Sequence, residues 1–136
     1  EVLVVTTPQQ AAAEVAERAG TMASMMDQRV IGVVENMSYL DAQCPHCGGT
    51  HRVDVFGTGG GAEVASKLTT RLGYQIPLLA EVPLDPAVRI GGDDGLPVVV
   101  AEPHGAGAIA LTELARNLGQ RRRSMAGRKL NLTPVA

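Results

Sequence analysis

Aromatic residues are scarce in this sequence of 136 residues, which contains two tyrosines, one phenylalanine and no tryptophan. Proteins that recognise nucleic acid by stacking its bases need several aromatic side chains on one surface. We therefore expect no nucleic-acid partner. The scarcity also means that valine, leucine, isoleucine, alanine and methionine have to fill the hydrophobic core.

Long apolar segments and the cysteine pairs of secreted domains are also lacking. The apolar runs span only a few residues, whereas a membrane-spanning helix needs about 20. Only two cysteines are present, and both lie in one short segment, so they do not form the disulfide framework of a small secreted protein. We expect a cytoplasmic protein with no membrane partner.

Charge is distributed unevenly along the chain, although the net charge is only −2. All fourteen acidic residues precede Arg116, whereas half of the twelve basic residues lie at Arg116 or beyond. Such a basic end can bind nucleic acid or a membrane surface, but arginines at the end of a helix also complement the helix dipole. We favour the second interpretation, and we expect residues 123–136 to form a basic, loosely ordered tail.

Strand and helix patterns alternate over residues 1–122, which predicts a single α/β domain. The predicted elements are strands at 1–6, 29–35 and 76–82 and helices at 8–26, 62–72 and 106–122. Residues 1–35 form a βαβ unit, so its two strands should be parallel. The first strand is apolar throughout and should be buried on both faces. Because it needs neighbours, and because Glu1 is not a start methionine, we expect a longer parent protein.

Several local patterns give finer expectations. Thr7 is placed to cap the first helix, with Pro8 as its first residue. An apolar stripe on this helix, expected to face the core, consists of Ala12, Val15, Ala19, Met22 and Met26. Gly73 should end the second helix, and residues 91–95 should form a turn. The stripe of the last helix consists of Leu111, Leu114, Ala115 and Leu118.

The segment 36–60 has neither helical nor strand periodicity, and we expect a loop containing cysteine and glycine. Its most distinctive feature is Cys44-Pro45-His46-Cys47-Gly48-Gly49. Two thiolates separated by two residues can converge on one metal ion or cluster. A redox pair is a different interpretation, but its first cysteine normally begins a helix, and the glycines here disfavour a helix.

Two metal-binding interpretations remain open. A zinc site within one chain needs four ligands; His46 or His51 could contribute, but even both would crowd the four ligands into eight residues. Alternatively, two chains each contribute Cys44 and Cys47, because four thiolates suit either zinc or a [4Fe–4S] cluster. The presence of only two cysteines favours the shared site, which a twofold dimer supplies.

The sequence gives little support for a dinucleotide site, a phosphate-binding loop or a catalytic nucleophile. The loop Gly57-Thr58-Gly59-Gly60-Gly61-Ala62 matches G-x-G-x-x-G/A, but it does not open the first βαβ unit, and we interpret it as a turn and helix entry. Neither Lys67 nor Lys129 lies in the P-loop pattern G-x-x-x-x-G-K-[ST]. No nucleophile elbow is present, so we assign no catalytic residues.

Several short motifs follow one another along residues 1–120. They are Val4-Val5-Thr6-Thr7-Pro8-Gln9, Gly32-Val33-Val34-Glu35-Asn36-Met37-Ser38, Cys44-Pro45-His46-Cys47-Gly48, Phe56-Gly57-Thr58-Gly59-Gly60-Gly61, Ile76-Pro77-Leu78-Leu79 and Val82-Pro83-Leu84-Asp85-Pro86. In this order they resemble the C-terminal half of the Mrp/ApbC family of iron–sulfur cluster carrier ATPases, which belongs to the MinD-like branch of the P-loop NTPases.

The resemblance implies the C-terminal part of a doubly wound, mainly parallel sheet flanked by helices, with an inserted Cys-x-x-Cys loop. It implies a homodimer in which Cys44 and Cys47 of each chain are the metal ligands of a bridging [4Fe–4S] cluster. Asn36 matches the residue that reads adenine, and Pro83 with Leu84 matches a loop beside the base. α/β sheets do bind ligands beyond the carboxyl ends of their strands.

By the same resemblance, the phosphate-binding loop and the acidic segment associated with Mg²⁺ should precede Glu1. We therefore expect the parent to bind and hydrolyse ATP and to pass its cluster to recipient apoproteins. This chain alone lacks the Walker A motif and should be inactive. The alternatives are a non-enzymatic, zinc-stabilised interaction module and a disulfide oxidoreductase.

Overall fold

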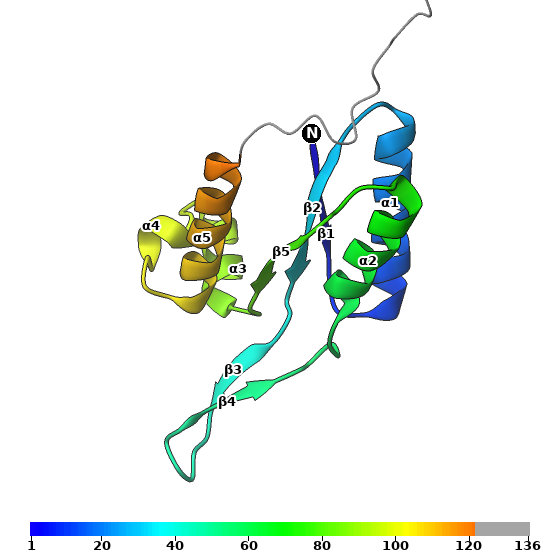
Figure 1. The fold of residues 1–136 in the computed structure, drawn as a ribbon. Helices are drawn as coiled ribbons and strands as arrows, with labels where there is room; N and C mark the ends of the chain where they lie inside the picture. Colours follow the sequence, from blue (N-terminus) through cyan, green and yellow to red (C-terminus); the bar gives the residue numbers. More distant parts are fainter. Residues whose placement is uncertain (122–136) are drawn as a thin grey trace, which may run out of the picture.

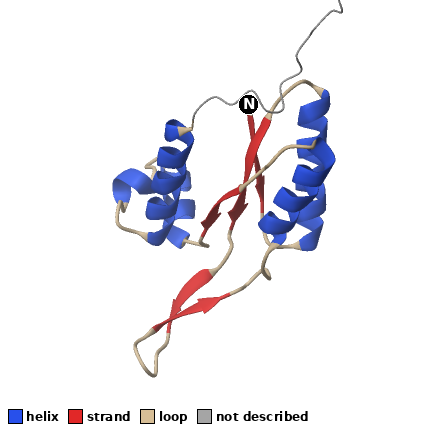
Figure 2. Ribbon diagram, viewed as in Figure 1, coloured by secondary structure: helices blue, strands red, loops and turns tan. Residues whose placement is uncertain are grey.

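The computed structural model describes residues 1–121, which form a parallel sheet with helices on both faces and a projecting hairpin (Figures 1 and 2). The expected tail at 123–136 lies outside the described residues. The elements are β1 (Val2–Thr6), α1 (Gln10–Met25), β2 (Val30–Asn36), β3 (Leu40–Gln43), β4 (Thr50–Val53), α2 (Gly60–Leu72), β5 (Leu78–Val82), α3 (Pro86–Asp94), α4 (Val98–Ala101) and α5 (Ala106–Gln120). None of these helices is long and apolar enough to cross a membrane.

The parallel sheet has the strand order β1-β2-β5, with β2 in the centre. Both pairings are parallel, as in the register pairs Val4↔Val33 and Glu35↔Glu81. This confirms the predicted βαβ unit and the α/β fold. Because all three strands run in one direction, their carboxyl ends meet at one edge of the sheet.

Two separate cores lie on the two faces of this sheet. Neighbouring residues of a strand point to opposite faces, so Val33 packs in the core under α1 and α2, and Val34 in the core under α5. Figure 1 shows α1 and α2 on one side of the sheet and α3, α4 and α5 on the other. The first core is the larger, and its buried members include Val64 and Leu68 of α2.

The expectation that the first strand is buried on both faces is wrong. Val5 is 57% exposed. Within the part of the chain that the structure describes, β1 pairs only with β2, so one of its edges has no strand beside it.

The apolar stripe predicted for the first helix also does not face the core. Val15, Met22 and Met26 are exposed, and the buried residues of α1 are Ala13, Ala16 and Gly20. The reason is the close approach of α2: a Cβ atom at Gly20 would lie 2.8 Å from a methyl carbon of Leu68. Only the face of α1 that carries small side chains fits against its neighbour.

The sequence expectations for helix ends hold at α2 but fail at the start of α1 and at the end of α3. Gln9, not Thr7, is the N-cap of α1 and makes no side-chain cap bond, whereas the Thr7 hydroxyl contacts Gln9 Oε1 at 3.3 Å. Gly73 ends α2 in the left-handed conformation, as predicted. The segment 91–95 is not a separate turn, because α3 continues to Asp94 and ends at Gly95, which has a φ of +71°.

Gly60 offers a test of how tightly the start of α2 packs against the segment that connects β1 and α1. A Cβ atom there would lie 2.6 Å from the backbone oxygen of Pro8, which cannot rotate away. We expect Gly60→Ala to lower the free energy of unfolding by about 1–3 kcal/mol through overpacking. The control is Gly92→Ala in exposed helix α3, where a Cβ meets none of the described residues within 4 Å. Alanine there should raise stability by about 0.5–1 kcal/mol, and urea denaturation measures both changes.

Candidate functional site

The segment expected to be a loop contains a two-stranded antiparallel hairpin, made by β3 and β4. Its register runs from Leu40↔Val53 to Gln43↔Thr50. The hairpin extends away from the parallel sheet, and both strands are short and largely exposed (Figure 1). Apolar and polar residues alternate only over the four residues of β3, Leu40–Gln43, and not in β4, so the pattern is too short for the sequence to reveal the two strands.

Side-chain contacts hold the base of the hairpin. The guanidinium of Arg52 lies over the ring of Tyr39, 4.1 Å from its centroid, which is a cation–π contact between the two arms. Arg52 Nε also donates to Asp54 Oδ1 at 3.1 Å, and this bond raises the pKa of Arg52. These side-chain contacts add to the backbone pairing at the base, which lies outside both cores.

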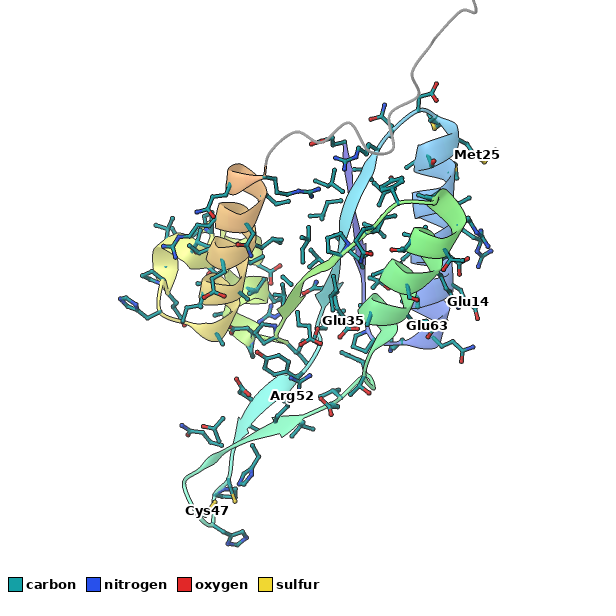
Figure 3. The ribbon with its side chains drawn as sticks, viewed as in Figure 1. Glu14, Met25, Glu35, Cys47, Arg52 and Glu63 are labelled. Carbon is teal, nitrogen blue, oxygen red and sulfur yellow. The ribbon has the colours of Figure 1, made fainter. Side chains whose placement is uncertain are left out.

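The cysteines lie at the opposite end, in the turn of the hairpin (Figure 3). The backbone N–H of Cys44 donates to the oxygen of Gly49 at 2.8 Å, and that of Gly48 donates to the oxygen of Cys44 at 2.9 Å. Gly48 has a φ of +68°, a conformation that residues with a Cβ rarely adopt. This tight turn places both sulfur atoms at the tip and leaves Cys47 exposed.

The tip brings together Cys44, Cys47 and His51, whose ligand atoms all lie within 4.8 Å of one another. Cys47 Sγ and His51 Nε2 are 3.5 Å apart. Sequence reasoning treated His46 and His51 alike, but His46 does not belong to this group. The glycines of the turn reverse the chain, so β4 returns His51 to the cysteines.

The turn also acts on the chemistry of the first thiol. The pKa of Cys44 is lowered because the backbone N–H of Cys47 points at its sulfur, and the N–H of His46 and the Cys47 thiol add to the effect. A lower pKa favours the thiolate, which is the form that binds metals. The thiolate here is not prepared by a helix N-terminus, because the cysteines lie between two strands. The geometry thus fits a metal site better than a thioredoxin-like redox pair.

The residues expected beside adenine lie at the carboxyl ends of β2 and β5. Ser38 N–H donates to the oxygen of Val82 at 3.0 Å, and Leu84 N–H donates to the oxygen of Tyr39 at 2.7 Å. These bonds continue the β2–β5 pairing past the sheet. They bring the expected residues, Asn36, Pro83 and Leu84, to one edge.

Asn36 is exposed there, and its side-chain orientation is fixed. Its Oδ1 atom accepts the backbone N–H of Met37 at 2.9 Å. Met37 has a φ of +54°, in the left-handed region that is costly for residues other than glycine. The bond from Asn36 supports this strained residue and leaves the amide NH₂ of Asn36 as a donor.

Sequence reasoning assigned no role to Glu35, which is 1% exposed. Its Oε2 atom accepts the backbone N–H of Gly61, in the first turn of α2, at 2.6 Å, and its backbone oxygen accepts the Ser38 hydroxyl at 2.9 Å. Figure 3 shows Glu35 between the sheet and the start of α2. A charged residue inside an apolar strand, followed later by a glycine-rich helix start, is the pattern that points to such a contact.

We expect Glu35→Ala to lower the free energy of unfolding by about 1–3 kcal/mol, because the buried Gly61 N–H loses its acceptor. Glu35→Gln keeps an acceptor oxygen and should lose less. Urea denaturation measures stability, and amide hydrogen exchange at Gly61 should quicken in the alanine variant alone. Equal losses in both variants would contradict the assigned hydrogen bond.

Comparison with known proteins identifies related sequences. The ParA family described as "NUBPL iron-transfer P-loop NTPase" matches residues 1–119. A protein of Mycobacterium bovis called "Iron-sulfur cluster carrier protein" is 50% identical over 135 residues, covering 99% of this chain and 34% of the relative. A protein of Synechocystis with the same name is 40% identical over 117 residues, covering 85% and 30%. The chain thus spans about a third of the length of these relatives.

Solved structures give the same fold. The cell division ATPase MinD of Pyrococcus furiosus matches with a TM-score of 0.63 and 25% identity, covering 87% of this chain and 41% of that one. MinD of Aquifex aeolicus matches with a TM-score of 0.60 and 18% identity, covering 90% and 44%. The second likeness concerns the fold alone.

Proposed function

This chain belongs to the NUBPL iron-transfer family of ParA P-loop NTPases, and we propose that it is the cluster-holding and base-contacting part of a longer ATPase. Relatives named iron-sulfur cluster carrier proteins support a carrier role. The observation that carries the proposal is the placement of Cys44 and Cys47 together at an exposed hairpin tip. Cargo that has to be received and released needs such a position.

The cargo in this proposal is a [4Fe–4S] cluster shared by two chains. Such a cluster takes four thiolates, and each chain offers two, so a homodimer with twofold symmetry completes the site. The hairpin tip lies away from both cores, and two tips can therefore approach without disturbing either domain. Exposed ligands also allow the cysteines of a recipient apoprotein to replace them.

The nucleotide part of the proposal rests on the edge where β2 and β5 end. Asn36 would bind adenine through its free amide NH₂, with Pro83 and Leu84 beside the base. ATP phosphates and Mg²⁺ would be bound by a segment preceding Glu1, and the parent would hydrolyse ATP in the cytoplasm. One edge of β1 has no strand beside it among the described residues, and this edge, with exposed Val5 and Val15, suits contact with that segment.

A zinc-stabilised interaction module is the second candidate, because His51 joins the two cysteines within one chain. The two functions predict different metal contents. Iron and acid-labile sulfide after anaerobic reconstitution support the carrier, and zinc without sulfide supports the module.

We expect the reconstituted parent to contain about four irons per dimer, as a four-ligand cluster requires. Cys44→Ala and Cys47→Ala should each abolish stable cluster binding without unfolding the domain, because the tip lies outside the cores. Iron and sulfide analysis, sedimentation and circular dichroism measure these outcomes. Four irons held stably per monomer would contradict the proposal, as would a Cys47→Ala dimer that keeps the cluster absorbance.

Asn36 allows its two hydrogen-bonding roles to be separated. Asn36→Ala in the parent should weaken ATP binding about two- to tenfold, the value of one lost neutral hydrogen bond, and leave cluster binding unchanged. Asn36→Asp keeps an acceptor for Met37 N–H but removes the amide donor, so it should weaken ATP binding as well. Calorimetric titration with ATP measures both. If Asn36→Asp binds as tightly as the wild type, Asn36 serves only to support Met37.

A further inference from the structure

We propose that a single chain binds one divalent transition-metal ion through Cys44, Cys47 and His51, with the fourth coordination position open to solvent. This mononuclear site goes beyond the cluster proposal, because it needs no second chain. It gives His51 a role as a metal ligand that the shared cluster does not require.

The inference rests on the distances between the sulfur and nitrogen atoms of the three side chains. In a tetrahedral site with a metal–sulfur bond of about 2.3 Å and a metal–nitrogen bond of about 2.0–2.1 Å, sulfur and nitrogen lie about 3.5 Å apart. Cys47 Sγ and His51 Nε2 are 3.5 Å apart, and Cys44 Sγ lies within 4.8 Å of both. A metal ion can therefore contact all three atoms after only small side-chain movements.

The backbone fixes two of the three ligands, one from each arm of the hairpin. His51 lies on β4, where it pairs with Ala42 of β3, so the antiparallel ladder fixes its position. Cys44 is fixed by its N–H bond to Gly49, at the point where the turn begins. His46 lies inside the turn, outside the antiparallel ladder, and does not belong to the group of converging ligand atoms.

The donor set defines the class of ion. Two thiolates and one imidazole suit zinc and other borderline-soft divalent transition metals, whereas Mg²⁺ and Ca²⁺ prefer oxygen ligands. Three protein ligands leave one position for water or an added thiol. Cys47 and His51 are exposed, so the ion can reach them directly.

The count of donors separates this site from the shared cluster. Two chains bring six donors to the dimer interface, and a four-ligand cluster leaves both histidines unused. Both sites need Cys44 and Cys47, so a metal ion on one chain and a cluster across two chains exclude each other. Zinc on the monomer should therefore oppose cluster assembly.

Anaerobic titration of the full 136-residue chain with Co²⁺ tests the inference, because tetrahedral Co²⁺ absorbs visible light strongly. We expect one Co²⁺ per chain, bound by a monomer in sedimentation experiments. His51→Ala should weaken Co²⁺ binding at least about tenfold, since even second-shell changes cost 10–100-fold in metal affinity. The matched control is His46→Ala, in the turn next to β4, which should bind within about twofold of the wild type.

The possible outcomes distinguish this inference from the cluster proposal. If His51→Ala binds Co²⁺ as tightly as the wild type, or if one Co²⁺ binds per two chains, the mononuclear site is wrong. If His51→Ala loses Co²⁺ binding while the parent carrying the same change still assembles a cluster, both hypotheses are supported. If the wild-type parent binds Co²⁺ but assembles no cluster, the cluster proposal alone fails. Circular dichroism verifies that each variant is folded.

Discussion

The buried carboxylate of Glu35 joins the two ends of the hairpin insertion. Its side chain binds the first turn of α2, where the chain returns from the hairpin, and its backbone binds Ser38, where the chain leaves the sheet. An unpaired carboxylate at this depth would be strongly unfavourable, so the contact with Gly61 is required wherever Glu35 is buried. The contact also requires glycine at position 61, because a Cβ there would lie 2.7 Å from Glu35 Cβ.

The hydrogen bond between Glu35 and Gly61 fixes the position of the strand edge at Asn36 relative to the hairpin that carries the cysteines. Asn36 follows Glu35 directly and lies at the edge where the parallel strands end. The cysteines lie at the far end of an antiparallel arm that starts from the same point (Figure 3). In the proposed function, a change in how adenine is bound at Asn36 would be transmitted to the β3–β4 hairpin through Glu35. In that proposal, the parallel sheet supplies the nucleotide edge and the insertion supplies the cargo position.

The sequence predicts those parts of the fold in which local pattern and tertiary contact agree. The buried strand β2, the βαβ unit and the end of α2 at Gly73 are such cases. The core face of α1 was not predictable from apolar periodicity, because close packing against Leu68 selects Gly20 and small residues over valine and methionine. The cysteine motif is visible in the sequence, but the choice of His51 over His46 depends on strand register, which short exposed strands do not reveal.

The hairpin tip contributes nothing to either core, and this separation has a consequence for how the protein can change. The residues that keep the domain folded are those of the sheet and its helices, and the residues proposed to hold the cargo lie at the hairpin tip. Under the proposed function, substitutions between Cys44 and His51 would alter metal preference while the free energy of unfolding stays nearly constant. Evolution or protein engineering can therefore substitute residues of the tip to suit a new cargo without destabilising the fold.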